Sequence, residues 1–258
     1  MYVAQQIRQA GLKFGKKTER MRPLPFPGLK EMYGGLLHLL YPNLCVGCDA
    51  DLPGGDYCFC IRCLSRLQPT DMYKHMENEF TDRLWGRLHI ESGAAMYYFS
   101  RKSPIQRALH RLKYQNQPDI GVRIGRRFGH LLSQSLHFGG VQAIVPVPLH
   151  RQKERQRGYN QSAMLAQGLA ESMGVPVLLN SLVRNLHTGS QTRKKRMERF
   201  ENVSEVFTVK HPAKIQGKHL LLVDDVLTTG ATLEACGKIL LEVPGVCLSL
   251  ATIAIAMK

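Results

Sequence analysis

The sequence predicts an α/β fold, a mostly parallel sheet flanked by helices, with a small cysteine-rich module before it. From residue 141 onward, short apolar runs alternate with helical patterns, an order typical of βαβ units. Before that region, four cysteines form two closely spaced pairs. The chain has 258 residues, enough for one such domain and one small module.

The first half of the chain has three predicted helices and one strand. Residues 31–41 form an amphipathic pattern that Pro42 ends, and residues 93–100 have the apolar and aromatic content of a strand. Ser103 can cap a helix over about 104–114, because proline at position 104 suits the first helical residue. A further helix is predicted over about 119–136.

The second half alternates regularly between strands and helices. Apolar runs predict strands over 141–147, 175–178, 206–209, 218–223 and 246–255. Apolar residues at helical spacing predict helices over 160–173 and 231–242.

The charge of the chain favours a polyanionic ligand. Thirty-five basic and 20 acidic residues give a net charge of +15, which suits nucleic acid or phosphorylated small molecules. A basic protein without such a ligand is the alternative. No run approaches the ~20 apolar residues of a membrane span, and the basic arm over residues 1–35 lacks the apolar core of a secretory signal. We therefore expect a cytoplasmic protein.

The paired cysteines predict a structural zinc site in a module over residues 36–70. Two CxxC pairs, with eleven residues between them, supply the four thiolates of a tetrahedral zinc shell, from Cys45, Cys48, Cys60 and Cys63. Cys58 is an alternative to Cys60 as the third ligand, and a redox pair or merely reduced thiols are alternatives to zinc. The remaining two cysteines, Cys236 and Cys247, are expected in the core.

An apolar run that ends in two carboxylates is the strongest functional signal. Asp224 and Asp225 follow the predicted strand over 218–223, and carboxylates there can accept hydrogen bonds from the hydroxyls of a ribose. Hydroxyls and backbone N–H groups at the next helix N-terminus can hold a phosphate, and they come from Thr228, Thr229, Gly230 and Thr232. The segment therefore predicts a site for a sugar 5′-phosphate. A capped turn is the alternative.

Residues 222–232 resemble the phosphoribosyl-pyrophosphate (PRPP) motif of type I phosphoribosyltransferases. The wider chain resembles the ComF family, which is associated with natural competence and DNA uptake. The matching stretches are the cysteine module and residues 112–114, 145–151, 155–161 and 191–202. The resemblance covers about residues 36–256.

The resemblance implies a type I phosphoribosyltransferase-like domain over residues 71–258. Asp224 and Asp225 would be the candidate catalytic residues and ribose ligands. The 5′-phosphate of PRPP would be held by Thr228, Thr229, Gly230 and Thr232. Arg151 would meet the diphosphate. Mg²⁺ would be held mainly by oxygens of PRPP. Residues 191–199 would be the mobile loop over the ligand.

Basic residues near this site allow two functional hypotheses. They can neutralise pyrophosphate in a PRPP-binding protein with transferase-type chemistry, whose acceptor the sequence does not identify. They can also line a groove for single-stranded DNA in a non-catalytic competence factor that uses the fold as a scaffold or sensor and meets DNA-uptake proteins. A solvated charged face is the alternative for the second basic stretch. The candidate nucleic-acid contacts are Arg155, Arg157, Tyr159, Arg193, Lys194 and Lys195. Tyr114 and Phe200 are further candidates for base stacking.

Overall fold

The computed structural model describes residues 42–52, 57–185 and 206–257. Beyond Pro42, this described part of the chain forms one compact unit. The helix predicted over 31–41 and the basic arm lie outside the described residues.

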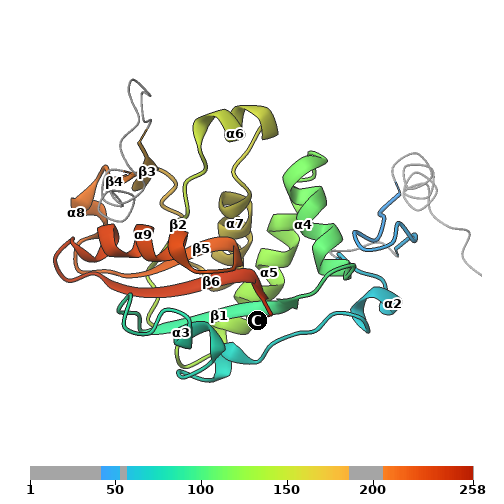
Figure 1. Cartoon of the computed structure of the whole chain (residues 1–258), viewed down its shortest axis with the longest axis horizontal. Coiled ribbons are helices and arrows are strands. Elements are labelled where there is room, and N and C mark those ends of the chain that lie inside the picture. The colour runs from blue at the N-terminus through green and yellow to red at the C-terminus, as the bar shows by residue number, and fades with distance from the viewer. Residues whose placement is uncertain (1–41, 53–56, 186–205, 258) are drawn as a thin grey trace, which may run out of the picture. The chain divides into compact units, whose positions relative to one another are not determined.

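The centre of the fold is a four-stranded parallel sheet with the order β1-β6-β5-β2 (Figure 1). Its strands are β1 (Ser92–Phe99), β6 (Cys247–Ala256), β5 (His219–Leu227) and β2 (Ala143–Pro146). The predicted parallel α/β architecture is therefore confirmed. The inner strand β5 contains four apolar residues, Leu220 to Val223, that are fully buried, as expected for a strand covered on both faces.

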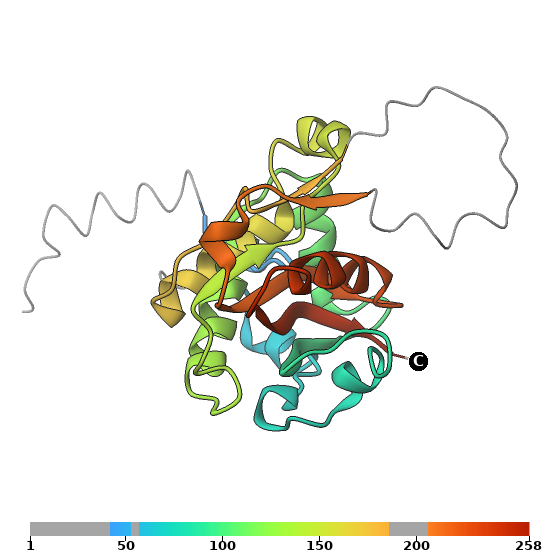
Figure 2. The same cartoon turned by 90° about the vertical axis from the view of Figure 1, so that its left-hand side faces the viewer.

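Helices cover both faces of the sheet. Helices α5 (Asp119–Ser133) and α7 (Gln161–Met173) pack against each other on one side, and α9 (Ala231–Leu241) lies along β5 and β6 on the other (Figure 2). The close contact of α5 and α7 depends on glycine. A Cβ atom added at Gly168 would lie 2.0 Å from the Val122 carbonyl oxygen.

Two helices at the upper part of Figure 1 carry several of the basic residues discussed below. Helix α4 (Pro104–Tyr114) begins as predicted, since the Ser103 hydroxyl accepts a hydrogen bond of 3.2 Å from the Gln106 N–H. Helix α6 (Arg151–Arg157) was not predicted. It begins at His150, whose Nδ1 accepts from the Gln152 N–H, and it ends at Gly158, which has a φ of 85°.

The helices before β1 in the described part of the chain are all short. They are α2 (Ile61–Leu64), the 3₁₀ helix η1 (Met72–Lys74) and α3 (Glu79–Asp82). Asn78 caps α3 through its side-chain oxygen. Within the described residues, no helix is long and apolar enough to cross a membrane.

The structure also differs from the sequence prediction at residues 175–178, at residues 206–209 and at Cys247. Residues 175–178 contribute only an isolated parallel bridge, between Val177 and Ile144. The segment over 206–209 becomes β4 (Phe207–Val209), which pairs antiparallel with β3 (Leu182–Arg184) outside the main sheet; a short helix, α8 (Pro212–Ile215), follows it. Cys236 is buried as expected, but Cys247 is exposed because it is the first residue of β6.

Candidate functional site

Asp224 and Asp225 lie where β5 has lost one of its two neighbouring strands. Strand β5 pairs with β2 only as far as Val223, whereas its pairing with β6 continues to Leu227. The prediction that the strand ends at Val223 is therefore wrong, because the β6 partner holds the backbone extended for four more residues. Asp224 and Asp225 thus lie in the strand, just beyond the end of its β2 neighbour.

Asp224 is held by two hydrogen bonds to one oxygen. Its Oδ1 accepts from the Ser162 hydroxyl at 2.9 Å and from the Asp225 N–H at 2.8 Å. Burial, and then the neighbouring Asp225 carboxylate, raise the pKa of Asp224 to about 7. The site therefore contains a carboxyl group that can exchange a proton near neutral pH.

Asp225 is buried and faces a cation. It is 6% exposed, and its Oδ2 lies 2.7 Å from the Lys113 Nζ at the end of α4. The contact is an ion pair between two buried or partly buried groups. Sequence reasoning assigned no role to Lys113 or Ser162. Lys113 belongs to the stretch 112–114, whose resemblance to the ComF family was a signal that could have pointed to it. No sequence signal pointed to Ser162.

The loop after β5 has the form expected of a phosphate site. Thr228, Thr229 and Thr232 are exposed, and Gly230 adopts a φ of 82° immediately before α9 begins. A side chain at Gly230 would be strained by this φ and would also approach Leu84 to 2.8 Å. The structure thus brings the hydroxyls and the helix N-terminus together a few residues after the carboxylates.

Arg151 lies on another element than the carboxylates and the loop hydroxyls, in the first turn of α6. It lines a cavity of about 350 Å³ together with Asn160, Arg184 and Lys210. Asn160, which caps α7, also donates a hydrogen bond of 2.9 Å to the Val147 carbonyl and so fixes the loop after β2. The positions of Arg184 and Lys210 flank segment 186–205, which includes the predicted mobile loop and lies outside the described residues.

A second basic pocket lies between α4 and α6. It has a volume of about 280 Å³ and is lined by Lys113, Tyr114, Asn116, Lys153, Gln156 and Arg157. The Tyr114 ring is exposed, and the Arg157 guanidinium lies 5.7 Å from its centroid. Lys113 therefore belongs both to this pocket and to the Asp225 ion pair.

The other predicted nucleic-acid contacts are not all gathered at this pocket. Arg155 lines a shallow surface pocket with Arg151 instead. Tyr159 is partly buried, and its hydroxyl donates a hydrogen bond of 2.5 Å to the Leu112 carbonyl. Arg193, Lys194, Lys195 and Phe200 lie outside the described residues.

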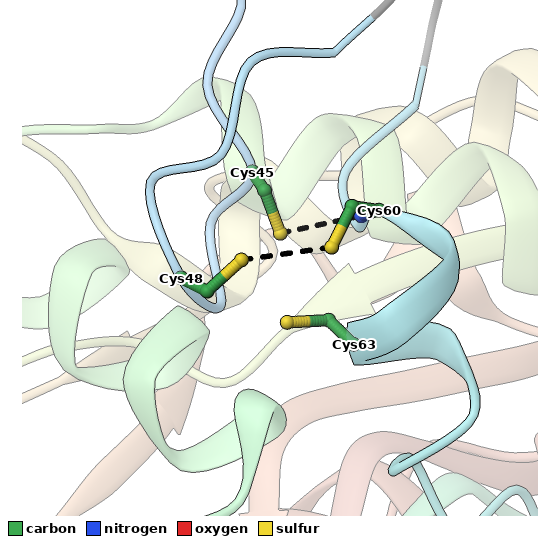
Figure 3. Close-up of side chains that lie close together, drawn as sticks. All are labelled: Cys45, Cys48, Cys60 and Cys63. Atoms are coloured by element: carbon green, nitrogen blue, oxygen red, sulfur yellow. Dashed lines mark hydrogen bonds between the residues drawn. The ribbon is translucent and has the colours of Figure 1, made fainter.

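The four predicted cysteine ligands form a compact cluster. Figure 3 shows the sulfurs of Cys45, Cys48, Cys60 and Cys63 facing one another, and all lie within 4.8 Å of each other. A tetrahedral zinc site with Zn–S bonds of about 2.3 Å requires sulfur separations of about 3.8 Å, so the arrangement could hold a metal ion of this kind. The cluster includes Cys60 and not Cys58.

The cysteine cluster is attached to the helix that carries Lys113. Asp49 lies 2.7 Å from Arg111 of α4, and the Gly47 carbonyl accepts a hydrogen bond of 2.9 Å from Arg107. Both contacts lie within or next to the first cysteine pair. The module is therefore fixed to α4, whose last turn reaches Asp225.

Comparisons with known proteins agree with this architecture. Residues 160–257 match the phosphoribosyl transferase domain family. Competence protein F of Haemophilus influenzae is 29% identical over 211 residues, which are 80% of this chain and 87% of that protein. The DNA utilization protein YhgH of Escherichia coli K12 is 31% identical over 54% of this chain and 62% of its own, so the match spans less than two thirds of YhgH.

Among solved structures, adenine phosphoribosyltransferase from Saccharomyces cerevisiae is 16% identical, with a TM-score of 0.37, over 61% of this chain and 75% of that one. The domain match covers β5, the loop over residues 228–230 and α9. The match to competence protein F extends over most of the chain. The chain is therefore similar to competence protein F over most of its length, and its C-terminal part matches the phosphoribosyl transferase domain family.

Proposed function

We propose that this chain binds PRPP and acts in the cytoplasm in DNA uptake. The observation that carries the proposal is the order of groups along one strand and loop. The carboxylates Asp224 and Asp225 are followed, after two residues, by exposed hydroxyls and a helix N-terminus. Carboxylates suit the ribose hydroxyls, and the loop suits the 5′-phosphate. The names of the relatives, a competence protein and a DNA utilization protein, support the biological setting.

The remaining parts of the ligand have candidate partners as well. Arg151 would meet the diphosphate, and Mg²⁺ would be held mainly by oxygens of PRPP itself. If transfer occurs, a nucleophile forms a bond to the anomeric carbon as the C–O bond to pyrophosphate breaks, and pyrophosphate leaves with the electron pair. Asp224 and Asp225 would then be the catalytic residues because they hold the sugar during this step. They do not identify the nucleophile.

The cysteine cluster would serve this protein as a structural zinc site. Its four sulfurs fill the usual zinc shell and leave no position for a substrate. We propose the division of the chain into an arm over 1–35, a zinc module over 36–70 and a phosphoribosyltransferase-like domain over 71–258. The zinc would stabilise a module that has few apolar residues of its own.

Calorimetry with PRPP and Mg²⁺ tests the proposed site. We expect the double variant Asp224→Asn with Asp225→Asn to lose measurable PRPP binding while its circular dichroism spectrum is unchanged. A matched control removes the same charge from the exposed sides of α5 and α7, with Asp119→Asn and Glu171→Gln, and should bind as the wild type does. Equal affinity of the carboxylate variant and the wild type would overturn the assignment.

A second candidate function is binding of single-stranded DNA without catalysis. The pocket between α4 and α6 favours it, because Lys113, Lys153 and Arg157 surround the exposed ring of Tyr114. Cations can contact the phosphates while a base stacks on the ring. Tyr114 is better suited to stacking than Tyr159, whose hydroxyl is engaged with Leu112.

Fluorescence anisotropy with a labelled oligonucleotide tests this candidate. Affinity should fall steeply as salt is raised, because phosphate contacts release counterions. We expect Tyr114→Ala to weaken binding by about tenfold, as loss of one stacked base does. Tyr57→Ala, at another exposed tyrosine, is the matched control. Absence of binding at low salt would rule out this function.

A further inference from the structure

Two arginines from the segment over residues 79–88 contact the back of the phosphate loop. Arg83 Nη1 donates a hydrogen bond of 3.1 Å to the Thr228 carbonyl, and Arg87 Nη1 donates one of 2.9 Å to the Thr229 carbonyl. Neither arginine belongs to a motif that the sequence identified. This segment consists of α3 and the six residues after it, and α3 packs beside β1 (Figure 1).

These contacts determine the direction of the loop's N–H groups. In a trans peptide, the N–H points opposite to the C=O of the same unit. The Thr228 and Thr229 carbonyls face the arginines, so the N–H groups of the following residues, Thr229 and Gly230, point away from them. In the described part of the chain, neither N–H has a hydrogen-bond acceptor.

The Arg83 side chain is buried and contacts three separate segments. Its side chain is 8% exposed and also contacts Glu79 and the carbonyl of Ala256 at the end of β6. It thus connects α3, the last strand and the loop. Its position is fixed from three directions, so the Thr228 carbonyl has little freedom to turn.

Arg87 connects the loop to the helix that follows it. Its guanidinium binds the Thr229 carbonyl and forms an ion pair with Glu234, in the first turn of α9. Leu84, between the two arginines, packs against Gly230 at a distance that leaves no room for a Cβ atom there. The segment therefore covers the loop with one apolar side chain between two cations.

We propose that Arg83 and Arg87 are positioning residues for a phosphate group, and that they act through the loop backbone. They turn the Thr228 and Thr229 carbonyls away from the ligand and so direct two free N–H groups toward it. Their charges also favour an anion on the opposite side of the loop. The proposal rests on the proposed function, because the phosphate is the 5′-phosphate of the phosphoribosyl ligand.

Ribose 5-phosphate is the probe, and Arg87→Met is the main variant because Arg87 is 40% exposed and its loss should not prevent folding. Calorimetry should show binding about tenfold weaker than in the wild type, as expected for the loss of a hydrogen bond from a charged donor. Arg87→Lys keeps a charged donor, so its affinity for ribose 5-phosphate should lie between those of Arg87→Met and the wild type. Arg126→Met removes another surface arginine that pairs with a glutamate, and should bind normally.

Amide NMR shifts separate a positioning role from a merely structural one. In the wild type, ribose 5-phosphate should shift the Thr229 and Gly230 amides, and in Arg87→Met these shifts should shrink while the unfolding temperature stays within about 2 °C. Arg83→Lys provides the same test at the more buried arginine. Unchanged affinity and shifts in both variants would overturn the inference, as would weaker binding explained entirely by a lower unfolding temperature. If the wild type itself binds no ribose 5-phosphate, the proposed function fails instead.

Discussion

Lys113 and Asp225 form a close ion pair, with 2.7 Å between Nζ and Oδ2, at the centre of the proposed site. The lysine comes from the last turn of α4 and the aspartate from β5. The lysine also lines the pocket between α4 and α6. It therefore connects the sugar site with the basic surface, and through Arg111 on the same helix it is connected to the cysteine cluster.

We expect Lys113→Met to destabilise the protein. It leaves the buried Asp225 carboxylate without its cation, so the free energy of unfolding should fall by about 1–3 kcal/mol. Urea denaturation measures the change. Adding Asp225→Asn should recover most of the loss, because the second change removes the unpaired charge.

Lys153→Met is the control for this cycle, since Lys153 lines the same pocket and is exposed. Its unfolding midpoint should match the wild type. A single Lys113→Met variant as stable as the wild type would show that the ion pair contributes nothing.

Asp224→Asn should stabilise the protein at high pH. The pKa of Asp224 is raised from 3.8 to about 7, so the folded state binds the proton more tightly than the unfolded state. The resulting contribution to stability is fully present below the unfolded value and is lost as pH rises through the folded value. Asparagine stays neutral in both states. The free energy of unfolding of the variant should therefore exceed that of the wild type by about 1–3 kcal/mol at pH 8, allowing for screening.

Unfolding at pH 4, 6 and 8 checks this prediction. The difference between Asp224→Asn and the wild type should shrink toward pH 4, where the Asp224 side chain is already protonated in the folded protein. Asp82→Asn, at an exposed aspartate, should show no such trend. A difference that does not change with pH would contradict the assigned pKa direction.

Cys60→Ser and Cys58→Ser form a matched pair for the metal site. The cysteines are two positions apart, but only the Cys60 sulfur belongs to the cluster. We expect Cys60→Ser to lose zinc to a chelator and to exchange amide hydrogens faster over residues 43–67, because metal binding and folding of the module are linked. Cys58→Ser should retain about one zinc per chain. Equal zinc retention by both variants would exclude the proposed ligand set.

Gly168→Ala should destabilise the contact between α5 and α7. Alanine favours helices by about 1 kcal/mol over glycine, but its Cβ would meet the Val122 carbonyl at 2.0 Å. Since backbone must move to relieve this contact, we expect a net loss of about 2–4 kcal/mol in thermal or urea unfolding. Gly139→Ala is the control, because the nearest atom to its added Cβ is 3.8 Å away. A stability gain in Gly168→Ala would show that the two helices can separate at little cost.

Much of the fold follows from local patterns. The strand over 246–255 was predicted nearly to its ends because its apolar run is a local signal. The helix over 104–114 was predicted equally well because Ser103 and Pro104 mark its start locally. The extension of β5 to Leu227 was not predictable, since polar residues 224 and 225 look like the end of a strand until β6 is seen to pair with them. The antiparallel pair β3–β4 was missed for the same reason, as pairing depends on a distant partner.

By itself the sequence determined the parallel α/β class, the four clustered cysteines and the order of carboxylates, hydroxyls and glycine from Asp224 to Thr232. These depend on the chemistry and spacing of residues that are close along the chain. Only the tertiary structure decided that Lys113 and Ser162 contact the two carboxylates, and that Arg83 and Arg87 donate hydrogen bonds to the loop after β5. Arg83 and Thr228 are 145 positions apart, and no local pattern can specify a contact that forms only when the packed sheet brings distant segments together.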